Sequence, residues 1–406
     1  MISILLTIAL SGSAFATPAC PAGSTLEGAP PPDGTEQWCS RGGTREGPAE
    51  RYHKEGEIKA RGNYQNGLAH GVWKEYHKNG AQKAQGEYVM GKRQGEWNYW
   101  YKSGDREGVG RYLTDQKDGA WTYWHESGEK WFDGEYSLGK ATGSWAYWHN
   151  NGQKDMAGNF IRGAKYGEWT QFHSNGQKKS IGTYVAGARD GKWSYWRDDG
   201  TVEKTGFFRG GKQSGEWVWS YPGGATQRVA HFDANGMTGL EQTYIESGRP
   251  ESETEYLNSQ KHGKETLFYP SGAKLSVSEY MRHKLNGVAT YYFEDGTVER
   301  TEQWNHGLKH GSWTAYWPNR GKKYQGDFEF GEYKGVWVYW YENGKKKGEG
   351  KFAAGRSEGV WVTWWENGER KKEGPYRAGK RHGTWTHYNE DGSVSKSETW
   401  VDGDLQ

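Results

Sequence analysis

The chain has 406 residues, of which 33% are hydrophobic and 16% aromatic, and its mean hydropathy is −1.08. Its 53 basic and 51 acidic side chains are interspersed and give a formal net charge of +2, which argues against a nucleic-acid partner. The 24 tryptophans, 27 tyrosines and 12 phenylalanines supply large rings to bury, so the composition predicts an ordered protein with an aromatic core.

The first sixteen residues predict a secretory signal peptide. An apolar run from Ile4 to Leu10 precedes Ala14-Phe15-Ala16, which has the A-x-A form of a cleavage site. The run is too short to span a membrane. We therefore expect the mature chain to begin at Thr17 and to be exported from a bacterial cell, either remaining periplasmic or envelope-associated or being secreted.

Residues 17–46 predict a small N-terminal cap. Cys20 and Cys39 are the only two cysteines of the chain, and in an exported protein they should form a disulfide. Chain-entropy reasoning assigns a loop of that length about 3 kcal/mol of stabilisation.

Residues 47–406 are a tandem repeat. Fifteen glycines, from Gly47 through Gly71 and Gly95 to Gly383, follow one another at a spacing of 24 residues without insertion or deletion. A fixed period of this size means that one supersecondary unit is copied along the chain and buries its apolar surface against its neighbours. The prediction is fifteen repeats of 24 residues, in which the first glycine is position 1.

Each repeat carries further fixed positions. Position 3 is Trp in eleven copies, position 6 is aromatic in fourteen, and position 18 is aromatic in all fifteen. Glycine returns at position 10 in fourteen copies, at position 16 in ten and at position 21 in eleven. In two representative copies the residues that define the pattern are Gly71, Trp73, Gly80, Gly86 and Tyr88, and Gly335, Trp337, Gly344, Gly350 and Phe352.

The repeat predicts a β-hairpin. Asn-Gly and Asp-Gly pairs at positions 9 and 10, such as Asn79-Gly80 and Asp199-Gly200, favour two-residue type I′ turns. Such a turn places position 3 opposite position 16, so that the indole faces a glycine across the hairpin. A second turn near position 21 returns the chain. We expect an all-β fold, an elongated single-ribbon antiparallel meander that advances about 9.6 Å per repeat.

Three consecutive repeats lose both members of that pair. Position 3 is Glu241, Glu265 and Ala289 there, while position 16 is Thr254, Ser278 and Glu302. The rule has exceptions, because Trp217 faces Ala230, Trp385 faces Glu398, and Ala49 keeps Gly62. The degenerate block, about residues 215–310, is either the product of drift, or a bend or partner-docking segment in which these six residues are the candidate contacts.

The repeat resembles a known family. Stretches such as Gly335-Val-Trp-Val-Tyr-Trp-Tyr-Glu-Asn-Gly344 and Gly350-Lys-Phe352 are similar to the MORN repeat, specifically the bacterial variant called YwqK-type and antitoxin-like. The resemblance covers all fifteen copies. It implies a ribbon of β-hairpins that serves in protein scaffolding and sometimes in lipid association.

The sequence offers little chemistry of catalysis or metal binding. The histidines at position 7, such as His125, His149 and His173, are one repeat apart, about 9.6 Å, too far to share a metal ion. No nucleophile-elbow motif, phosphate-binding loop or Cys–His pair occurs. We expect a protein that is not an enzyme and needs no cofactor.

The placement of charge favours a binding role. Lys or Arg recurs in the loop at positions 22 to 24, as at Lys92 and Lys380, and acids recur at positions 8 and 9, as at Glu126 and Glu342. These charges either keep the sheet soluble or bind an anionic partner by repetition. The leading hypothesis is an exported scaffold that binds a protein. The alternatives are binding of a cell-wall glycan through exposed Trp and Tyr, association with an anionic lipid surface, and an antitoxin or immunity protein that binds a cognate toxin.

Overall fold

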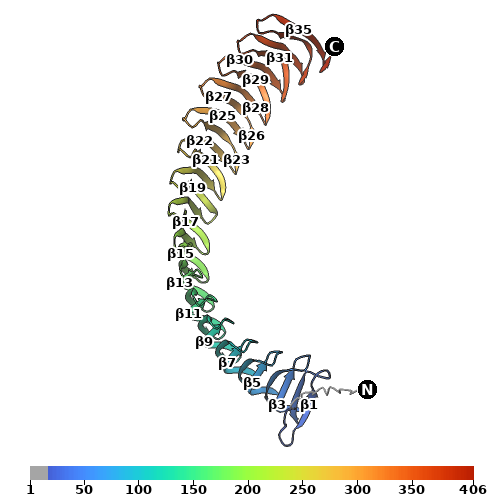
Figure 1. Cartoon of the computed structure of the whole chain (residues 1–406), viewed down its shortest axis with the longest axis vertical. Coiled ribbons are helices and arrows are strands. Elements are labelled where there is room, and N and C mark those ends of the chain that lie inside the picture. The colour runs from blue at the N-terminus through green and yellow to red at the C-terminus, as the bar shows by residue number, and fades with distance from the viewer. Residues whose placement is uncertain (1–16) are drawn as a thin grey trace, which may run out of the picture. The chain divides into compact units, whose positions relative to one another are not determined.

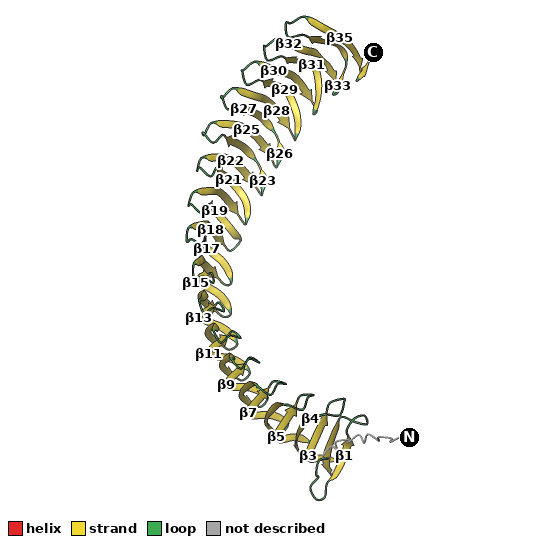
Figure 2. Ribbon diagram, viewed as in Figure 1, coloured by secondary structure: helices red, strands yellow, loops and turns green. Residues whose placement is uncertain are grey.

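The computed structural model describes residues 17–406, so the predicted signal peptide lies outside the described residues. Every regular element of this part of the chain is a β-strand (Figure 2). The strands form a 36-stranded antiparallel sheet whose first and last strands pair only with their chain neighbours, so the sheet is open. No helix that is long and apolar enough to cross a membrane is found between residues 17 and 406. The predicted all-β meander is confirmed.

The chain divides into two compact units, residues 17–190 with 198–200 and residues 191–197 with 201–406. Within each unit the strands follow one another in chain order (Figure 1). The strands before the division are β1 (Thr25–Ala29), β2 (Glu36–Arg41), β3 (Thr44–Tyr52), β4 (Ile58–Gln65), β5 (Leu68–Tyr76), β6 (Gln82–Val89), β7 (Lys92–Trp100), β8 (Arg106–Leu113), β9 (Gln116–Trp124), β10 (Lys130–Ser137), β11 (Lys140–Trp148), β12 (Lys154–Ile161), β13 (Ala164–Phe172) and β14 (Lys178–Val185).

The division falls within β15 (Ala188–Trp196). The strands that follow are β16 (Val202–Arg209), β17 (Lys212–Ser220), β18 (Thr226–Asp233), β19 (Gly236–Tyr244), β20 (Pro250–Leu257), β21 (Gln260–Phe268), β22 (Lys274–Met281), β23 (Lys284–Leu285), β24 (Gly287–Tyr292), β25 (Val298–Asn305), β26 (Leu308–Lys309), β27 (Gly311–Tyr316), β28 (Lys322–Glu329), β29 (Glu332–Trp340), β30 (Lys346–Ala353), β31 (Arg356–Trp364), β32 (Arg370–Arg377), β33 (Lys380–Arg381), β34 (Gly383–Tyr388), β35 (Val394–Val401) and β36 (Asp404–Leu405).

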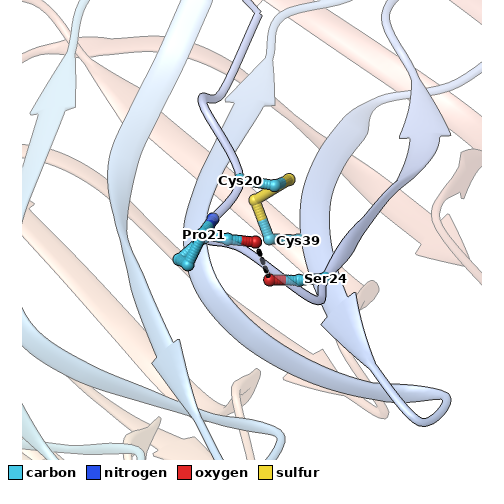
Figure 3. The surroundings of a disulfide bond; sticks show 4 residues. All are labelled: Cys20, Pro21, Ser24 and Cys39. Atoms are coloured by element: carbon cyan, nitrogen blue, oxygen red, sulfur yellow. Dashed lines mark hydrogen bonds between the residues drawn. A yellow bond between two sulfur atoms is a disulfide. The ribbon is translucent and has the colours of Figure 1, made fainter.

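The N-terminal cap continues the plan of the repeats. Strands β1 and β2 form an antiparallel hairpin, and β2 pairs with β3, so the cap supplies two further strands to the sheet. Cys20 and Cys39 form the predicted disulfide, which joins the segment before β1 to strand β2 (Figure 3). Cys39 is fully buried, and Ser24 donates a hydrogen bond of 2.7 Å to the carbonyl oxygen of Pro21 beside it.

The register of the repeats is the predicted one. Trp73 lies opposite Gly86, Trp97 opposite Gly110, and Trp337 opposite Gly350. Position 3 therefore faces position 16 within each hairpin. Side chains alternate between the two faces of a strand, so the tryptophans all lie on one face of the sheet, which we call the aromatic face.

The turn that sets this register differs from the predicted type I′ turn. The amide of Gly80 donates to the carbonyl oxygen of His77, and the amide of His77 donates to that of Ala81, which leaves a three-residue loop. Gly80 has a φ of 82°, but Asn79 is not left-handed, whereas a type I′ turn needs positive φ at both central residues. A register shift after Glu75 compensates for the odd loop length, and this compensation restores the predicted pairing.

Type I′ turns occur at the other edge of the sheet. Leu138 and Gly139 have φ values of 47° and 78° and connect the paired residues Ser137 and Lys140. Two residues with positive φ match the right-handed twist of the flanking strands. The glycine of position 21 therefore serves the tight turn, while that of position 10 closes the three-residue loop.

The glycine that begins each repeat lies at a β-bulge. Gly95 has a φ of 68°, and the pairing of β6 with β7 shifts register between Gln85 and Glu87, opposite this residue. All fifteen glycines at position 1 have positive φ, from 61° at Gly311 to 109° at Gly287. A residue in the left-handed region of a bulge is favoured to be glycine, which gives the strict 24-residue period its physical reason.

The indoles pack one hairpin away from the predicted place. A Cβ added to Gly62 would lie 2.2 Å from the ring of Trp73, although Trp73 pairs with Gly86. The indole nitrogen of Trp73 also donates a hydrogen bond of 3.1 Å to the carbonyl oxygen of Asn63. Each ring thus leans toward the N-terminal neighbour and covers the glycine eleven residues earlier, which couples successive repeats.

This corrected contact removes the exceptions noted in the sequence. Trp217 covers Gly206, Trp385 covers Gly374, and Gly62 is covered by Trp73, so none of these pairs is mismatched. One mismatch remains, because Trp313 lies eleven residues after Glu302. At the glycines of position 16 that an indole covers, such as Gly62 and Gly206, an added side chain would overlap the ring of the next repeat.

Candidate binding groove on the second unit

An ordinary indole of the aromatic face is covered on every side. Trp121 covers Gly110 below, while the ammonium of Lys117 lies 4.1 Å above the ring and the ring of Tyr123 stacks at 5.8 Å. As a result Trp121 is completely buried. Lys117 and Tyr123 lie four residues before and two residues after the tryptophan. The third neighbouring position, thirteen residues before it, is Gly108 here, and the ring of Tyr123 fills the space beside that glycine.

These covers change the interpretation of the basic loops. Arg93, Lys117, Lys165, Lys309 and Arg381, all at position 23, place their cationic groups over neighbouring rings at 3.9 to 4.6 Å. Burial lowers the pKa values of Lys117 and Lys165, which is the expected effect of removing an ammonium from water. Position 23 therefore serves the core, and the exposed basic residues of this edge are those at positions 22 and 24, such as Lys92 and Lys380.

The indole of Trp361 lacks this cover, in contrast to that of Trp337 one repeat earlier. Trp337 has tyrosines at the three positions thirteen and four residues before it and two residues after it, and it is 3% exposed. The rings of Tyr324, Tyr333 and Tyr339 lie 6.0, 4.8 and 6.1 Å from that of Trp337.

At Trp361, one repeat later, the same three positions are Gly348, Ser357 and Thr363. Ten of the eleven tryptophans at position 3 are 0 to 6% exposed, whereas Trp361 is half-buried. Three substitutions of a ring by a small side chain thus open the face of a single indole. Trp73 also has small residues nearby, but the guanidinium of Arg51 lies 4.7 Å above its ring.

The opening forms a groove of about 440 Å³ across strands β28 to β32. Gly348, Trp361, Thr363, Tyr324 and Tyr339 all line it. Burial raises the pKa of Tyr339 to about 12, so its hydroxyl group is protonated and able to donate at neutral pH. The groove is therefore lined by ring faces with hydroxyl groups around them.

Four lysines also line the groove. Lys323 lies 4.4 Å from the ring of Trp317, Lys347 lies 5.4 Å from that of Tyr341, and Lys371 lies 4.0 Å from that of Trp365. The fourth, Lys372, has a pKa lowered by burial and by the nearby charges of Arg381 and Lys371.

Residues 17–406 offer no carboxylate within 4.0 Å of the ammonium groups of these four groove lysines. The ion pairs of the same strands instead join Lys346 to Glu349 and Arg370 to Glu373. The groove therefore has an uncompensated positive charge, held in place by cation–π contacts.

The rings beneath these lysines are fixed to the following repeat. The indole of Trp317 donates a hydrogen bond of 3.3 Å to the carbonyl oxygen of Trp340. The hydroxyl group of Tyr341 donates one of 2.8 Å to the carbonyl oxygen of Trp364. The indole of Trp365 donates one of 3.2 Å to the carbonyl oxygen of Tyr388. Each bond crosses from position 7 to the main chain of the next copy. The wall of the groove is consequently tied to the sheet and preformed.

Comparison with known families agrees with this architecture. The family model described as "MORN repeat variant" matches residues 45–66, 69–89, 165–186, 333–354, 357–378 and 381–402. The matched segments recur in the register of the 24-residue period and include strands β29 to β32 of the groove. This is a MORN-repeat protein.

The MORN-repeat array has distant structural likenesses. A crystal structure of TcdB2-TccC3 shares 10% identity over 94% of this chain and 27% of that chain, with a TM-score of 0.14. A Tc holotoxin pore from Photorhabdus luminescens shares 10% identity over 92% of this chain and 26% of that chain, with a TM-score of 0.13. The present chain spans about a quarter of their length, and TM-scores this low carry no argument. Among curated proteins, none matches the sequence.

The degenerate block of the MORN-repeat array does not expose its predicted docking residues. Thr254, Glu265, Ser278, Ala289 and Glu302 are 0 to 8% exposed, and Glu241 is half-buried. Their side chains occupy the aromatic face where indoles and glycines lie in other repeats. Five of the six residues are therefore enclosed, and a partner cannot reach an enclosed side chain.

The buried carboxylates of the block have partners within the sheet. Arg228 donates a hydrogen bond of 2.5 Å to Glu241, and Lys261 pairs with Glu265. Glu302 accepts hydrogen bonds from Arg300 at 2.9 Å and from the indole of Trp304 at 3.2 Å. A buried carboxylate needs such partners to offset its lost hydration, so ion pairs replace the indole packing here.

The histidines at position 7 also have structural partners. Nε2 of His125 lies 2.9 Å from the carbonyl oxygen of Trp148, and Nε2 of His77 lies 2.8 Å from that of Trp100. These are the contacts that Trp and Tyr make at the same position beside the groove. No group of three or more His, Cys, Asp and Glu side chains able to hold a metal occurs in the described range of 17–406.

A second hollow, of about 750 Å³, lies near the cap. It is lined by Glu36 and Glu55 together with four basic side chains, of which Arg51 contacts Glu36 at 3.1 Å and Lys78 contacts Glu55 at 2.9 Å. Unlike the Trp361 groove, this hollow therefore contains carboxylates that pair with part of its positive charge. In the sequence, the signal of the Trp361 groove lies at positions 5, 14 and 23 of the repeat, whereas positions 3 and 16 carry none.

Proposed function

We propose that this MORN-repeat protein is a non-enzymatic binding scaffold that acts outside the cytoplasm, and that the Trp361 groove is its binding site. The observation that carries the proposal is the contrast between Trp337 and Trp361. Successive copies of one repeat differ by the loss of three rings, and this loss opens a preformed recess beside Trp361. Preformed recesses lined by rings and a few polar groups are typical ligand sites.

The composition of the groove supports binding in place of catalysis. Its lining consists of aromatic rings, lysines, Thr363 and Gly348. Rings and ammonium groups give affinity and orientation to a ligand, and neighbouring repeats tie them in place through main-chain hydrogen bonds. A rigid repeated surface of this kind is well suited to hold a partner.

The proposed location is the periplasm, the cell envelope or the exterior. The Cys20–Cys39 disulfide fits a compartment outside the cytoplasm, where such bonds persist. The expected signal peptide, residues 1–16, would direct the chain there.

The test uses the mature chain from Thr17, mixed with fractionated cell envelope. A refilled variant, Gly348→Tyr, Ser357→Tyr and Thr363→Tyr together, copies the three covering tyrosines of Trp337 into the groove. We expect wild type to be retained and the refilled variant to be lost. Equal retention of the two proteins would refute the groove as the binding site.

A control separates added bulk from lost binding. Val360 is 63% exposed and precedes Trp361, so Val360→Tyr adds a ring on the opposite face of the sheet. This control should be retained like wild type. A single protein recovered at fixed stoichiometry would identify a protein partner, including the cognate toxin of an antitoxin, as the ligand.

A further inference from the structure

We infer that the ligand of the Trp361 groove is an acidic sugar, a pyranose ring carrying a carboxylate or phosphate, presented in a glycan of the cell envelope. This inference rests on the proposed function, because it names the ligand of the same groove. Three features of the groove carry it: an open ring face, free hydroxyl groups beside that face, and lysines without carboxylate partners.

The open face of Trp361 is suited to a flat, partly apolar ligand. Gly350 lies beneath the indole, where an added Cβ would be 2.0 Å from the ring, and the rings of Phe352 and Tyr376 meet it at 5.0 and 6.0 Å in edge-on geometry. The remaining face borders the space left by Gly348 and Thr363. A pyranose presents a face of C–H groups that packs on such a ring.

Hydroxyl groups beside this face suit a hydroxylated ring. Within the described chain, the hydroxyl groups of Tyr324 and Tyr339 have no protein hydrogen-bond partner, whereas that of Tyr341 donates to the carbonyl oxygen of Trp364. A ligand that hydrogen-bonds to such a hydroxyl group adds to the binding free energy without breaking a bond within the protein, because the new bond replaces only a bond to water. A sugar offers several such donors and acceptors around its edge, which a lipid tail or an apolar peptide side chain does not.

The lysines select for negative charge. Lys323, Lys347 and Lys371 are at position 13 of three successive repeats, so their attachment points advance by about 9.6 Å per repeat. An acidic chain that runs across the strands can meet one lysine after another, and its affinity then rises with length through effective concentration. The lowered pKa of Lys372 agrees with this inference, because a bound anion would offset the neighbouring charges of Arg381 and Lys371.

The test measures binding of defined probes to the mature protein by titration calorimetry. The acidic probes are galacturonic acid oligomers of increasing length and glucose 6-phosphate, which distinguish carboxylate from phosphate. The neutral probe is a malto-oligosaccharide of matched length, and oligoglutamate represents an acidic peptide. We expect the acidic sugars to bind at least about tenfold more tightly than the neutral one, a difference of about 1.4 kcal/mol, and the longer oligomers to bind best.

Three variants connect that binding to the groove. Lys347→Gln and Lys371→Gln should each weaken binding of the acidic oligomer about fivefold, the upper range for an exposed charge pair. Lys92→Gln removes an exposed lysine of the first unit and should leave binding unchanged. The refilled variant should not bind, and unfolding curves that match those of wild type would show that it folds.

The outcomes separate this inference from the proposed function. Retention on envelope that the refilled variant loses, together with no preference for acidic over neutral sugars, would overturn the sugar inference and leave the groove as the binding site. Oligoglutamate binding as tightly as the uronate oligomers would assign the groove to an acidic peptide instead. Envelope retention that the refilled variant keeps would overturn both.

Discussion

The indole of Trp121 covers Gly110, and a Cβ built on that glycine would lie 2.0 Å from the ring. The two residues belong to adjacent strands, β8 and β9, and to successive repeats. Position 16 and position 3 thus form one contact that recurs between neighbouring copies, and the coupling of the array depends on it.

Gly110→Ala should destabilise the array by about 3 kcal/mol, because the added methyl group overlaps the ring and forces strand or indole to move. Hydrogen exchange of the amides of β8 and β9 would locate the effect. Gly348→Ala is the matched control, since the nearest atom to its Cβ is 3.7 Å away, and it should change stability little. Similar losses in both variants would contradict the packing contact.

Gly119→Ala tests the role of the glycine at position 1. No atom lies within 4 Å of a Cβ at this site, but the backbone has a φ of 73°. Substitution should therefore cost about 1 to 2 kcal/mol through the backbone conformation alone. Gly119→Asn should cost less, because Asn tolerates the left-handed region. Chemical unfolding of the two variants measures the difference, and equal costs would exclude the conformational explanation.

His125→Ala should destabilise the protein by about 1 kcal/mol, because it removes the contact between Nε2 and the carbonyl oxygen of Trp148. His125→Tyr should recover most of the loss, since Tyr101 makes the corresponding bond of 2.7 Å to Trp124. Thermal unfolding with and without a chelator provides the comparison. Stabilisation by added zinc that His125→Ala abolishes would show that this residue binds metal instead.

Alkaline pH should weaken the degenerate block. Burial, followed by the carboxylate of Glu241, raises the pKa of Tyr256 to about 12 from 10.0. A raised pKa favours the protonated form in the folded state, so its stabilisation is complete below pH 10 and is lost as pH rises toward about 12. Because the ring is partly exposed, we expect a fall of about 1 kcal/mol.

Unfolding curves at pH 8, 10 and 12 would measure this fall, and Tyr256→Phe should make it smaller. An unchanged pH dependence in Tyr256→Phe would show that the loss of stability arises at other groups.

Much of the architecture could be predicted from spacing. The period is set by Gly47 and its fourteen successors, and the pairing of Trp73 with Gly86 follows from the position of the intervening turn. The turn type was predicted incorrectly, yet the register was right, because the register shift after Glu75 offsets the three-residue loop. Strand pairing therefore depended on the sum of loop and bulge, which the repeat length constrains.

The candidate site could not be predicted in the same way. Glu241 and Glu265 drew attention because they depart from the consensus, but both are held in the packing by Arg228 and Lys261. The groove arises where the covers of Trp361 are small. Those covers come from strands β30 and β31, at positions with no consensus residue among the repeats. A variable position signals a site only once its neighbour across the sheet is known.

The all-β class, the 24-residue unit, the strand register and the aromatic composition of the core all follow from the order of the amino acids. These depend on local rules, because the backbone conformation of glycine and the alternation of side chains act within a few residues. The direction in which each indole leans, and with it the enclosure of Trp337 and the opening at Trp361, is visible only in the packed array. That choice depends on the volumes of side chains from adjacent strands, which meet only when the repeats are packed together.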